Sequence, residues 1–399
     1  MGLSTFFIPA LLLATPKWNI TVVILLGVYA GYLVIKNGIP HLGLPDKLLI
    51  FCFGFYFLSA VPNCVTEDFR TRILDAPSRH LFAAVLLLGL LHIKQKLKIE
   101  SYYWGATAGA LGALVVACYE YFIVGLQRVG GFQFSINYGF LAAALAAVCL
   151  CGWFYFRRER SRALSLLGFG AALVATVMTG TRGAWIAIPP VILFVLVSLR
   201  PRIGVRGILL GTMLALVASG ATYSYVGSVE SRVNIAIKEF AAFVNDPPNA
   251  QLNSTSTRLM HWVVAWEVVK ESPFRGMNYA ERPHFFSSLV EQGKVLDFRE
   301  GDPGKNHGHA HHELLEAGAS RGVPGMLSTL LLYVIPLFYF YRQRKQDIVV
   351  STTGGVFVFS FIIFGLSEAP LLDNSISVFF LSTLVIFWVA VSSPHESNA

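Results

Sequence analysis

The sequence predicts an all-α polytopic membrane protein with about twelve transmembrane helices and one large extracytoplasmic loop. Of its 399 residues, 55% are hydrophobic and 14% are charged, whereas soluble domains average about 25% charged residues. Apolar runs recur along the chain, and one long polar stretch at 226–321 interrupts them. The short basic clusters between the runs are distributed unevenly, as the connections of a multi-pass protein are.

Reading the apolar runs against turn residues and charges gives the expected membrane spans. The apolar N-terminus lacks a charged n-region and a clear cleavage site, so we interpret it as a retained span and not as a signal peptide. The expected spans are 2–14, 18–35, 46–62, 80–93, 102–124, 134–156, 163–179, 183–199, 207–225, 322–341, 349–367 and 375–392.

The distribution of Lys and Arg predicts the orientation. If the N-terminus is cytoplasmic, the short connections on that side hold fifteen basic residues, and those on the other side hold six. The remaining ten lie in 226–321, which the rule excludes because long loops cross the membrane largely regardless of charge. We therefore expect cytoplasmic termini and a long loop that faces away from the cytoplasm.

The formal charge of +8 does not indicate a nucleic-acid-binding protein. The long loop contains ten basic and twelve acidic residues, so the positive balance comes entirely from the other segments. The five cysteines all precede residue 152 in or beside apolar runs. That placement predicts neither a disulfide framework nor a thiolate metal site.

One helix is expected in the loop at 254–271, where Ser254-Thr255-Ser256-Thr257 supplies N-cap candidates and Ser272-Pro273 ends it. Arg258 lies in its first turn, where a cation opposes the helix dipole unless an anion compensates. Arg258 is therefore either an anion-binding residue or an exposed arginine. Helical spacing predicts one apolar face made of Leu259, Trp262, Val263, Trp266 and Val269.

Histidines cluster just before the tenth expected span, in Asn306-His307-Gly308-His309-Ala310-His311-His312-Glu313-Leu314-Leu315-Glu316. Histidine exchanges a proton near neutral pH, so one of them is a candidate general base oriented by its neighbours. The cluster is also a candidate metal site with Glu313 and Glu316, although its spacing matches no familiar zinc motif. Loop packing is the third interpretation.

Other polar residues are expected on the same external face. Arg182, in Thr179-Gly180-Thr181-Arg182-Gly183-Ala184-Trp185, lies at a membrane boundary, where a guanidinium either meets an anion or anchors lipid headgroups. Arg70, Arg72 and Arg79 are candidates for acidic lipid or substrate phosphates, or are ordinary surface charges. Glu368 and Asp373, in the last external turn, are either helix-end residues or partners of the site.

Three of these segments together resemble the O-antigen ligase and polymerase superfamily of bacterial membrane glycosyltransferases. Thr181-Arg182-Gly183-Ala184-Trp185 is similar to the family's Ser/Thr-Arg-Gly-Ala-Trp/Leu segment. The second segment is Ser256-Thr257-Arg258 with Trp262, Trp266 and Pro273-Phe274-Arg275-Gly276. The third is His309-Ala310-His311-His312-Glu313-Leu314-Leu315-Glu316 with Gly322-Val323-Pro324-Gly325, in which His312 replaces the usual Asn.

The resemblance implies a GT-C-like fold, with transmembrane helices 1–9 in 1–225, a periplasmic catalytic loop in 226–321, and helices 10–12 with a short cytoplasmic tail in 322–399. It implies an O-antigen ligase in lipopolysaccharide biosynthesis that lies in the inner (plasma) membrane of a bacterium and acts without cofactor or metal ion. The donor would be O-antigen on undecaprenyl diphosphate and the acceptor a sugar hydroxyl of lipid A-core. His311 would be the base, while Arg182 and Arg258 would contact the diphosphate and His309 and His312 the substrate.

Two relatives within the superfamily share this donor class, namely O-antigen polymerase and protein O-oligosaccharyltransferase. A single long external loop and a chain that stops soon after its last span favour the ligase. A lipid-linked sugar transporter would place ionisable residues inside its spans, where Glu120 is the main one here. A metal sensor using the histidines is the remaining alternative.

Overall fold

The computed structural model describes residues 2–66, 71–225, 227–245, 254–278, 280–297 and 308–392. Every regular element within these ranges is a helix, which confirms the all-α, apolar character expected of a polytopic membrane protein. Arg70, Asn306 and His307, singled out in the sequence, fall outside the described residues.

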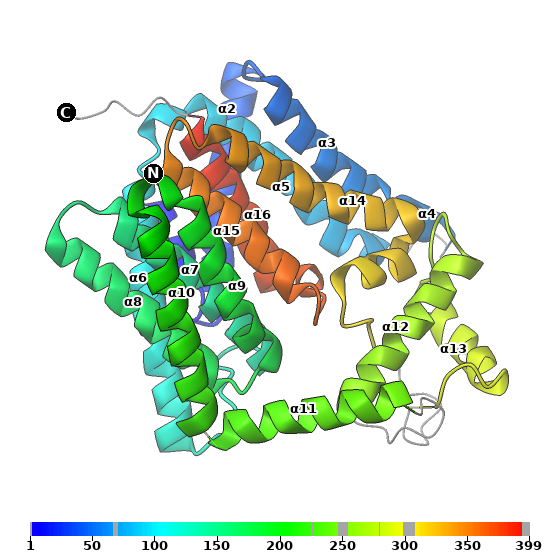
Figure 1. The fold of residues 1–399 in the computed structure, drawn as a ribbon. Coiled ribbons are helices and arrows are strands. Elements are labelled where there is room, and N and C mark those ends of the chain that lie inside the picture. Colours follow the sequence, from blue (N-terminus) through cyan, green and yellow to red (C-terminus); the bar gives the residue numbers. More distant parts are fainter. Residues whose placement is uncertain are drawn as a thin grey trace.

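Figure 1 shows the order of the helices along the chain. In order they are α1 (Gly2–Ala10), α2 (Trp18–Asn37), α3 (Leu44–Leu58), α4 (Val61–Thr66), α5 (Asp75–His92), α6 (Ile99–Cys118), α7 (Ser135–Tyr155), α8 (Glu159–Met178), α9 (Arg182–Ser198), α10 (Arg200–Tyr225), α11 (Gly227–Asn245), α12 (Ser254–Glu271), α13 (Glu281–Glu291), α14 (Glu313–Gln343), α15 (Ile348–Phe364) and α16 (Asn374–Val391).

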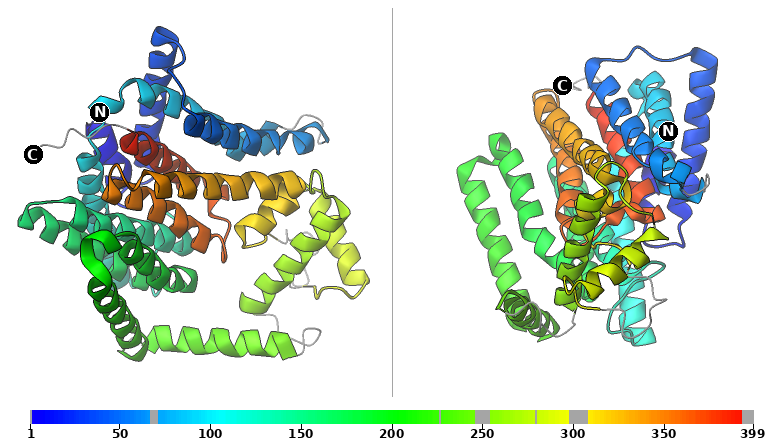
Figure 2. Two further views of the ribbon diagram at one scale, coloured as in Figure 1. Left: turned by 45° about the horizontal axis from the view of Figure 1, so that its top comes forward. Right: turned by 90° about the vertical axis from the view of Figure 1, so that its right-hand side faces the viewer.

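The last three helices lie between two groups of earlier ones. In both views of the bundle, α2, α3 and α5 lie on one side of α14–α16, and α6–α10 lie on the other (Figures 1 and 2). Helix α11 runs along the edge of the molecule from α10 toward α12, and α12 and α13 pack beyond the start of α14 (Figure 1). Segments distant in sequence therefore meet near the beginning of α14.

Eight of the described helical segments are long and apolar enough to cross a membrane. Two further apolar helices, α9 and α15, are shorter than these eight. The first expected span is only nine residues of helix in α1, or roughly 14 Å at 1.5 Å per residue. That length falls well short of a hydrocarbon core about 30 Å thick. The number of twelve crossings stays a prediction.

Hydrogen bonds between buried hydroxyls connect the bundle internally. The Tyr102 hydroxyl on α6 lies 2.6 Å from Thr383 Oγ1 on α16, and the Tyr103 hydroxyl lies 2.7 Å from Thr353 Oγ1 on α15. All four side chains are fully buried or nearly so. Because lipid offers no alternative partner, such polar groups are satisfied by pairing between helices.

Helix α14 bends at Gly322, where the tenth span was expected to begin. Gly322 has φ +65° and ψ −163°, a backbone conformation essentially restricted to glycine. The Val323 amide donates to the Pro273 carbonyl at 2.7 Å, and a Cβ on Gly322 would lie 2.4 Å from the same oxygen. The bend therefore seats the turn after α12 directly against α14.

Replacing Gly322 with alanine is expected to lower the free energy of unfolding by about 1–3 kcal/mol, because the new Cβ meets both a forbidden φ and a backbone carbonyl. Thermal melting of the purified protein in detergent measures the loss. Gly54→Ala is the matched control, since this helical glycine has open space around its missing Cβ. Equal melting temperatures for the two variants would contradict the prediction.

Connections predicted to be external converge on one face. A cavity of about 740 Å³ is lined by residues from four of them, including Lys17, Arg72, Asn278 and Asp373. This gathering agrees with the predicted alternation of helix directions. Which side of the membrane the face occupies stays a prediction.

Candidate active site

The segment before α14 is held in place by main-chain contacts on both sides. The Ala310 amide donates to Glu316 Oε2 at 2.8 Å, and the Glu313 amide donates to the Gly365 carbonyl at 2.7 Å. His311 has φ +49°, in the left-handed region that histidine adopts more often than most residues. The segment 308–312 is therefore a fixed turn between α14 and the end of α15.

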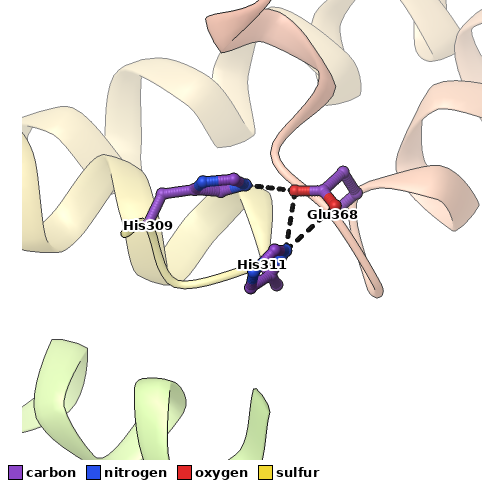
Figure 3. A group of neighbouring side chains, drawn as sticks. All are labelled: His309, His311 and Glu368. Carbon is purple, nitrogen blue, oxygen red and sulfur yellow. Dashed lines mark hydrogen bonds and ion pairs between the residues drawn. The ribbon is translucent and has the colours of Figure 1, made fainter. Parts of the chain in front are cut away.

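Glu368, in the turn after α15, brings two of these histidines together (Figure 3). Its carboxylate is hydrogen-bonded to His309 Nε2, and His311 Nδ1 lies 2.9 Å from Oε2 and 3.1 Å from Oε1. The Glu368 side chain is 8% exposed, whereas the His311 side chain is 27% exposed. A carboxylate at Nδ1 favours the tautomer with the proton on Nδ1, which leaves Nε2 as a proton acceptor.

The histidines and the carboxylate shift one another's protonation. Burial by itself would raise the pKa of Glu368, but hydrogen bonds from His309 and His311 outweigh burial and hold that pKa below its usual range. Burial would lower the pKa of His309, and the hydrogen bond and charge of Glu368 raise it on balance. The shifts therefore favour the ionised form of Glu368 and extend upward the pH range in which His309 is positively charged.

This pairing predicts a pH window for stability. A lowered Glu368 pKa contributes stability above the unfolded value of 4.5, lost as the pH falls toward the folded value. A raised His309 pKa contributes stability below the unfolded value of 6.5, lost as the pH rises through the folded value. The difference in melting temperature between wild type and His309→Gln should be largest between pH 4.5 and 6.5. A difference independent of pH would contradict the charged pair.

Arg258 and Arg182 reach the same place from two other helices. Arg258 on α12 interacts electrostatically with Glu368 and with Arg182, and burial lowers its pKa. Arg182 begins α9, and its Nη1 lies 3.8 Å from Glu239 Oε2 on α11. The Thr255 hydroxyl donates to the same Glu239 oxygen at 2.5 Å. The structure thus brings both predicted arginines close to the histidine turn, together with the carboxylates of Glu239 and Glu368.

His312 has a visible structural role at the start of α14. It is the N-cap residue, and its Nδ1 accepts from the Leu315 amide at 3.4 Å. Its ring packs edge-on to Trp262, with centroids 5.3 Å apart, and burial lowers its pKa. Contact of His312 with substrate stays a prediction.

The predicted apolar face of α12 is wrong for Trp266 and Val263, whereas Val269 is buried as predicted. Trp266 is 50% exposed and Val263 is 38% exposed, while the side buried against α13 and α14 includes Met260, His261 and Val264. His261 lies on the buried face and Trp266 on the exposed face, so the apolar residues alone do not indicate which side of α12 is buried. Exposed tryptophan is common where a protein meets the membrane interface.

Two neighbours of the histidine turn were not predicted. The His261 ring on α12 lies edge-on to His311, with centroids 5.5 Å apart. Arg282 on α13 pairs with Glu316 on α14 at 2.8 Å, and both side chains are almost completely buried. Glu316 was visible in the histidine segment, whereas nothing in the spacing of Arg282 singled it out.

The same atoms also form a candidate metal site. One ligand atom each from His309, His311 and Glu368 lies within 4.8 Å of the others. Two imidazoles and a carboxylate are a known ligand set for zinc. The geometry therefore accommodates either a proton-sharing cluster or a metal ion, and the choice between them is a matter for experiment.

Comparisons with known proteins agree with the resemblance seen in the sequence. The O-antigen ligase family model matches residues 167–330, a range that contains all five predicted site residues and ends before Glu368. The chain is 24% identical to the O-antigen ligase of Escherichia coli over 59% of this chain and 53% of that one. It is 25% identical to an uncharacterized protein of Haemophilus influenzae over 97% of this chain and 96% of that one.

Proposed function

We propose that this chain, which carries an O-antigen ligase domain at residues 167–330, transfers polysaccharide from undecaprenyl diphosphate to a sugar hydroxyl of lipid A-core on the periplasmic face. The reaction would be an inverting, metal-independent glycosyl transfer. One observation carries the proposal: Glu368 fixes Nδ1 of His311, Arg258 interacts electrostatically with Glu368, and Arg182 interacts in turn with Arg258. A base and an anion-binding group are the two things such a transfer needs.

His311 Nε2 would take the proton from the acceptor hydroxyl. The acceptor oxygen then forms a bond to the anomeric carbon as the bond from that carbon to the diphosphate oxygen breaks, so the configuration inverts once. Undecaprenyl diphosphate leaves as an anion. Arg258 and Arg182 would stabilise its charge through hydrogen bonds from their guanidinium groups, which bind phosphate oxygens in bidentate fashion.

Glu368 would act through the histidines and not on the substrate. Its carboxylate orients His311 and stabilises the imidazolium that forms when the ring accepts a proton. The partial burial of Arg258 increases the strength of its interaction with a diphosphate, because less water competes for the guanidinium. His309 shares the same carboxylate and so limits the movement of that carboxylate.

The alternative functions differ from the ligase in the acceptor or in the residues expected inside the membrane spans. O-antigen polymerase and protein O-oligosaccharyltransferase would use the same donor and arginines, and differ only in the acceptor. For a lipid-linked sugar transporter, the main ionisable residue expected in a span was Glu120. Its Oε2 accepts from the Gly130 and Gly131 amides at 2.8 and 2.9 Å at the end of α6, which favours a structural role.

Ligation by purified protein in nanodiscs, with lipid A-core, undecaprenyl-diphosphate O-antigen and EDTA, tests the proposal. We expect lipopolysaccharide of high molecular weight from wild type, and a loss of about 10²–10⁴-fold in rate for His311→Ala. Arg258→Ala should also lose the product. His41→Ala and Arg162→Ala are matched controls, because His41 lies between α2 and α3 and Arg162 pairs with Glu159 on α8.

Other outcomes identify the alternatives. If EDTA abolishes the product and zinc restores it, the histidines are metal ligands and the base assignment is wrong. If the donor grows on its own lipid while lipid A-core stays unmodified, the protein is a polymerase. If glycan appears on a protein acceptor alone, it is an oligosaccharyltransferase.

A further inference from the structure

An apolar groove runs between helices from both ends of the chain. It has a volume of about 270 Å³ and lies between α2, α5 and α16. Each helix contributes one wall, with Val23 on α2, Ala83 on α5 and Leu381 on α16. All three helices belong to candidate membrane spans. Most of the lining side chains are apolar, so the groove suits a hydrocarbon chain of a membrane lipid.

Arg79 lies where this groove meets the large polar cavity. Arg79 and Asn374 line both the groove and the cavity of about 740 Å³. The Arg79 side chain is 13% exposed, and it donates from Nη1 to the Ser377 hydroxyl at 2.8 Å and from Nη2 to Asp75 at 2.7 Å. These bonds use two of the five N–H donors of the guanidinium. A fixed arginine at the boundary of apolar and polar space suits a lipid phosphate.

Further charges surround the mouth of the cavity. Lys17 and Arg72 are basic, and Asp75 and Asp373 are acidic. Asp75 is engaged by Arg79, and Asp373 caps α16 by accepting from the Ile376 amide at 3.1 Å. The two carboxylates are therefore used within the protein, and the rim is net positive when Arg79 is included.

The other end of the cavity reaches the back of the candidate active site. Its inner wall includes Glu313, Arg321 and the buried pair Arg282–Glu316. That pair also borders the small pocket that holds His261 and His309. A head group that fills the cavity would therefore end next to the Arg282–Glu316 pair, which also borders the pocket lined by His309.

We propose that the groove and the cavity together bind a phosphorylated glycolipid. One hydrocarbon chain occupies the groove, the phosphate lies against Arg79 near Lys17 and Arg72, and the sugar extends toward Arg282. This assignment rests on the proposed function in one respect: it makes this lipid the acceptor, in a site separate from the diphosphate at Arg182 and Arg258.

Binding in nanodiscs of phosphatidylcholine tests the site directly, with lipid A-core and undecaprenyl diphosphate as separate probes. Arg79→Gln should weaken lipid A-core binding by about 10- to 100-fold, because a charged hydrogen bond is lost. Ala83→Phe should weaken it by filling the groove. Neither change should affect undecaprenyl diphosphate. Arg162→Gln and Val174→Phe are matched controls on α8, whose side chains lie outside the groove and the cavity.

Competition distinguishes the sources of the phosphate. If the site takes a whole lipid, lipid A-core lacking its phosphates and inorganic phosphate alone should both bind more weakly than intact lipid A-core. Inorganic phosphate that binds as tightly as lipid A-core, and equally well to Ala83→Phe, would overturn the role of the groove. Unchanged lipid A-core binding in both variants would overturn the site.

Failure of the site and failure of the proposed function give different results. In transfer assays, Arg79→Gln should raise the KM for the acceptor and leave the KM for the donor unchanged. If wild type binds lipid A-core at this site and never transfers sugar to it, the proposed function fails and the lipid site stands. If transfer proceeds and the acceptor KM of Arg79→Gln equals that of wild type, the lipid site fails alone.

Discussion

Glu368→Gln is expected to reduce the rate of sugar transfer by about 10²–10⁴-fold, with little change in the KM for either substrate. A glutamine amide presents one oxygen where the carboxylate presents two, so it cannot accept from both histidines in the same way. It also carries no charge to stabilise a protonated His311. The base then loses both its preferred tautomer and its stabilised imidazolium. Single-turnover assays with saturating substrates measure the effect.

Three comparisons separate this role from a general loss of folding. Glu368→Asp keeps the charge and should recover part of the rate. The pH profile of Glu368→Gln should shift relative to wild type, which a purely structural defect would not cause. Asp347→Asn is the matched control, because Asp347 caps α15 at its other end by accepting from the Val349 and Val350 amides. Full activity in Glu368→Gln would remove Glu368 from the mechanism.

The sequence predicts most of the helices because few backbone structures are stable in a lipid environment. A backbone in hydrocarbon must form its hydrogen bonds within the segment, so long apolar runs become helices. Charged residues between the runs mark where these helices end. Elements at the membrane surface are less predictable. The first expected span is a short helix α1, and α14 extends back to Glu313, well before its expected start at 322. Packing against α12 and the turn after it, and not hydropathy, accompanies this extension. Ala265 and Val268 of α12 are buried together with Ala319, and the Met277 amide donates to the Ala319 carbonyl at 2.8 Å.

The site was partly predictable for a related reason. His311, Arg182 and Arg258 stand out because charged or titratable residues near a membrane require a partner. Glu368 was only one of two acidic residues in its turn, and nothing in the sequence connects it with histidines 57 and 59 positions earlier. Arg282 is still less conspicuous. Residues that meet only through tertiary packing produce no recognisable pattern in the local sequence.

Breaking the buried Arg282–Glu316 pair should destabilise the protein more than the loss of any other side-chain contact near the site. Glu316→Leu removes the carboxylate that accepts from Arg282, from the Ser320 hydroxyl at 2.7 Å and from the Ala310 amide at 2.8 Å. The Arg282 charge then stays buried without its counter-ion. We expect the free energy of unfolding to fall by about 3–5 kcal/mol, measured as a large drop in melting temperature in detergent.

The double variant Arg282→Met with Glu316→Leu tests whether the unpaired Arg282 charge causes this loss of stability. It removes both charges together, so it should recover much of the stability that Glu316→Leu loses, because well-packed apolar residues often replace a buried ion pair without cost. Transfer should nevertheless stay impaired in the double variant, since Ala310 loses the carboxylate that fixes the histidine turn. If the double variant melts no higher than Glu316→Leu, the stranded charge is not the origin of the loss. If it also transfers sugar at the wild-type rate, the Glu316 contact does not position His311.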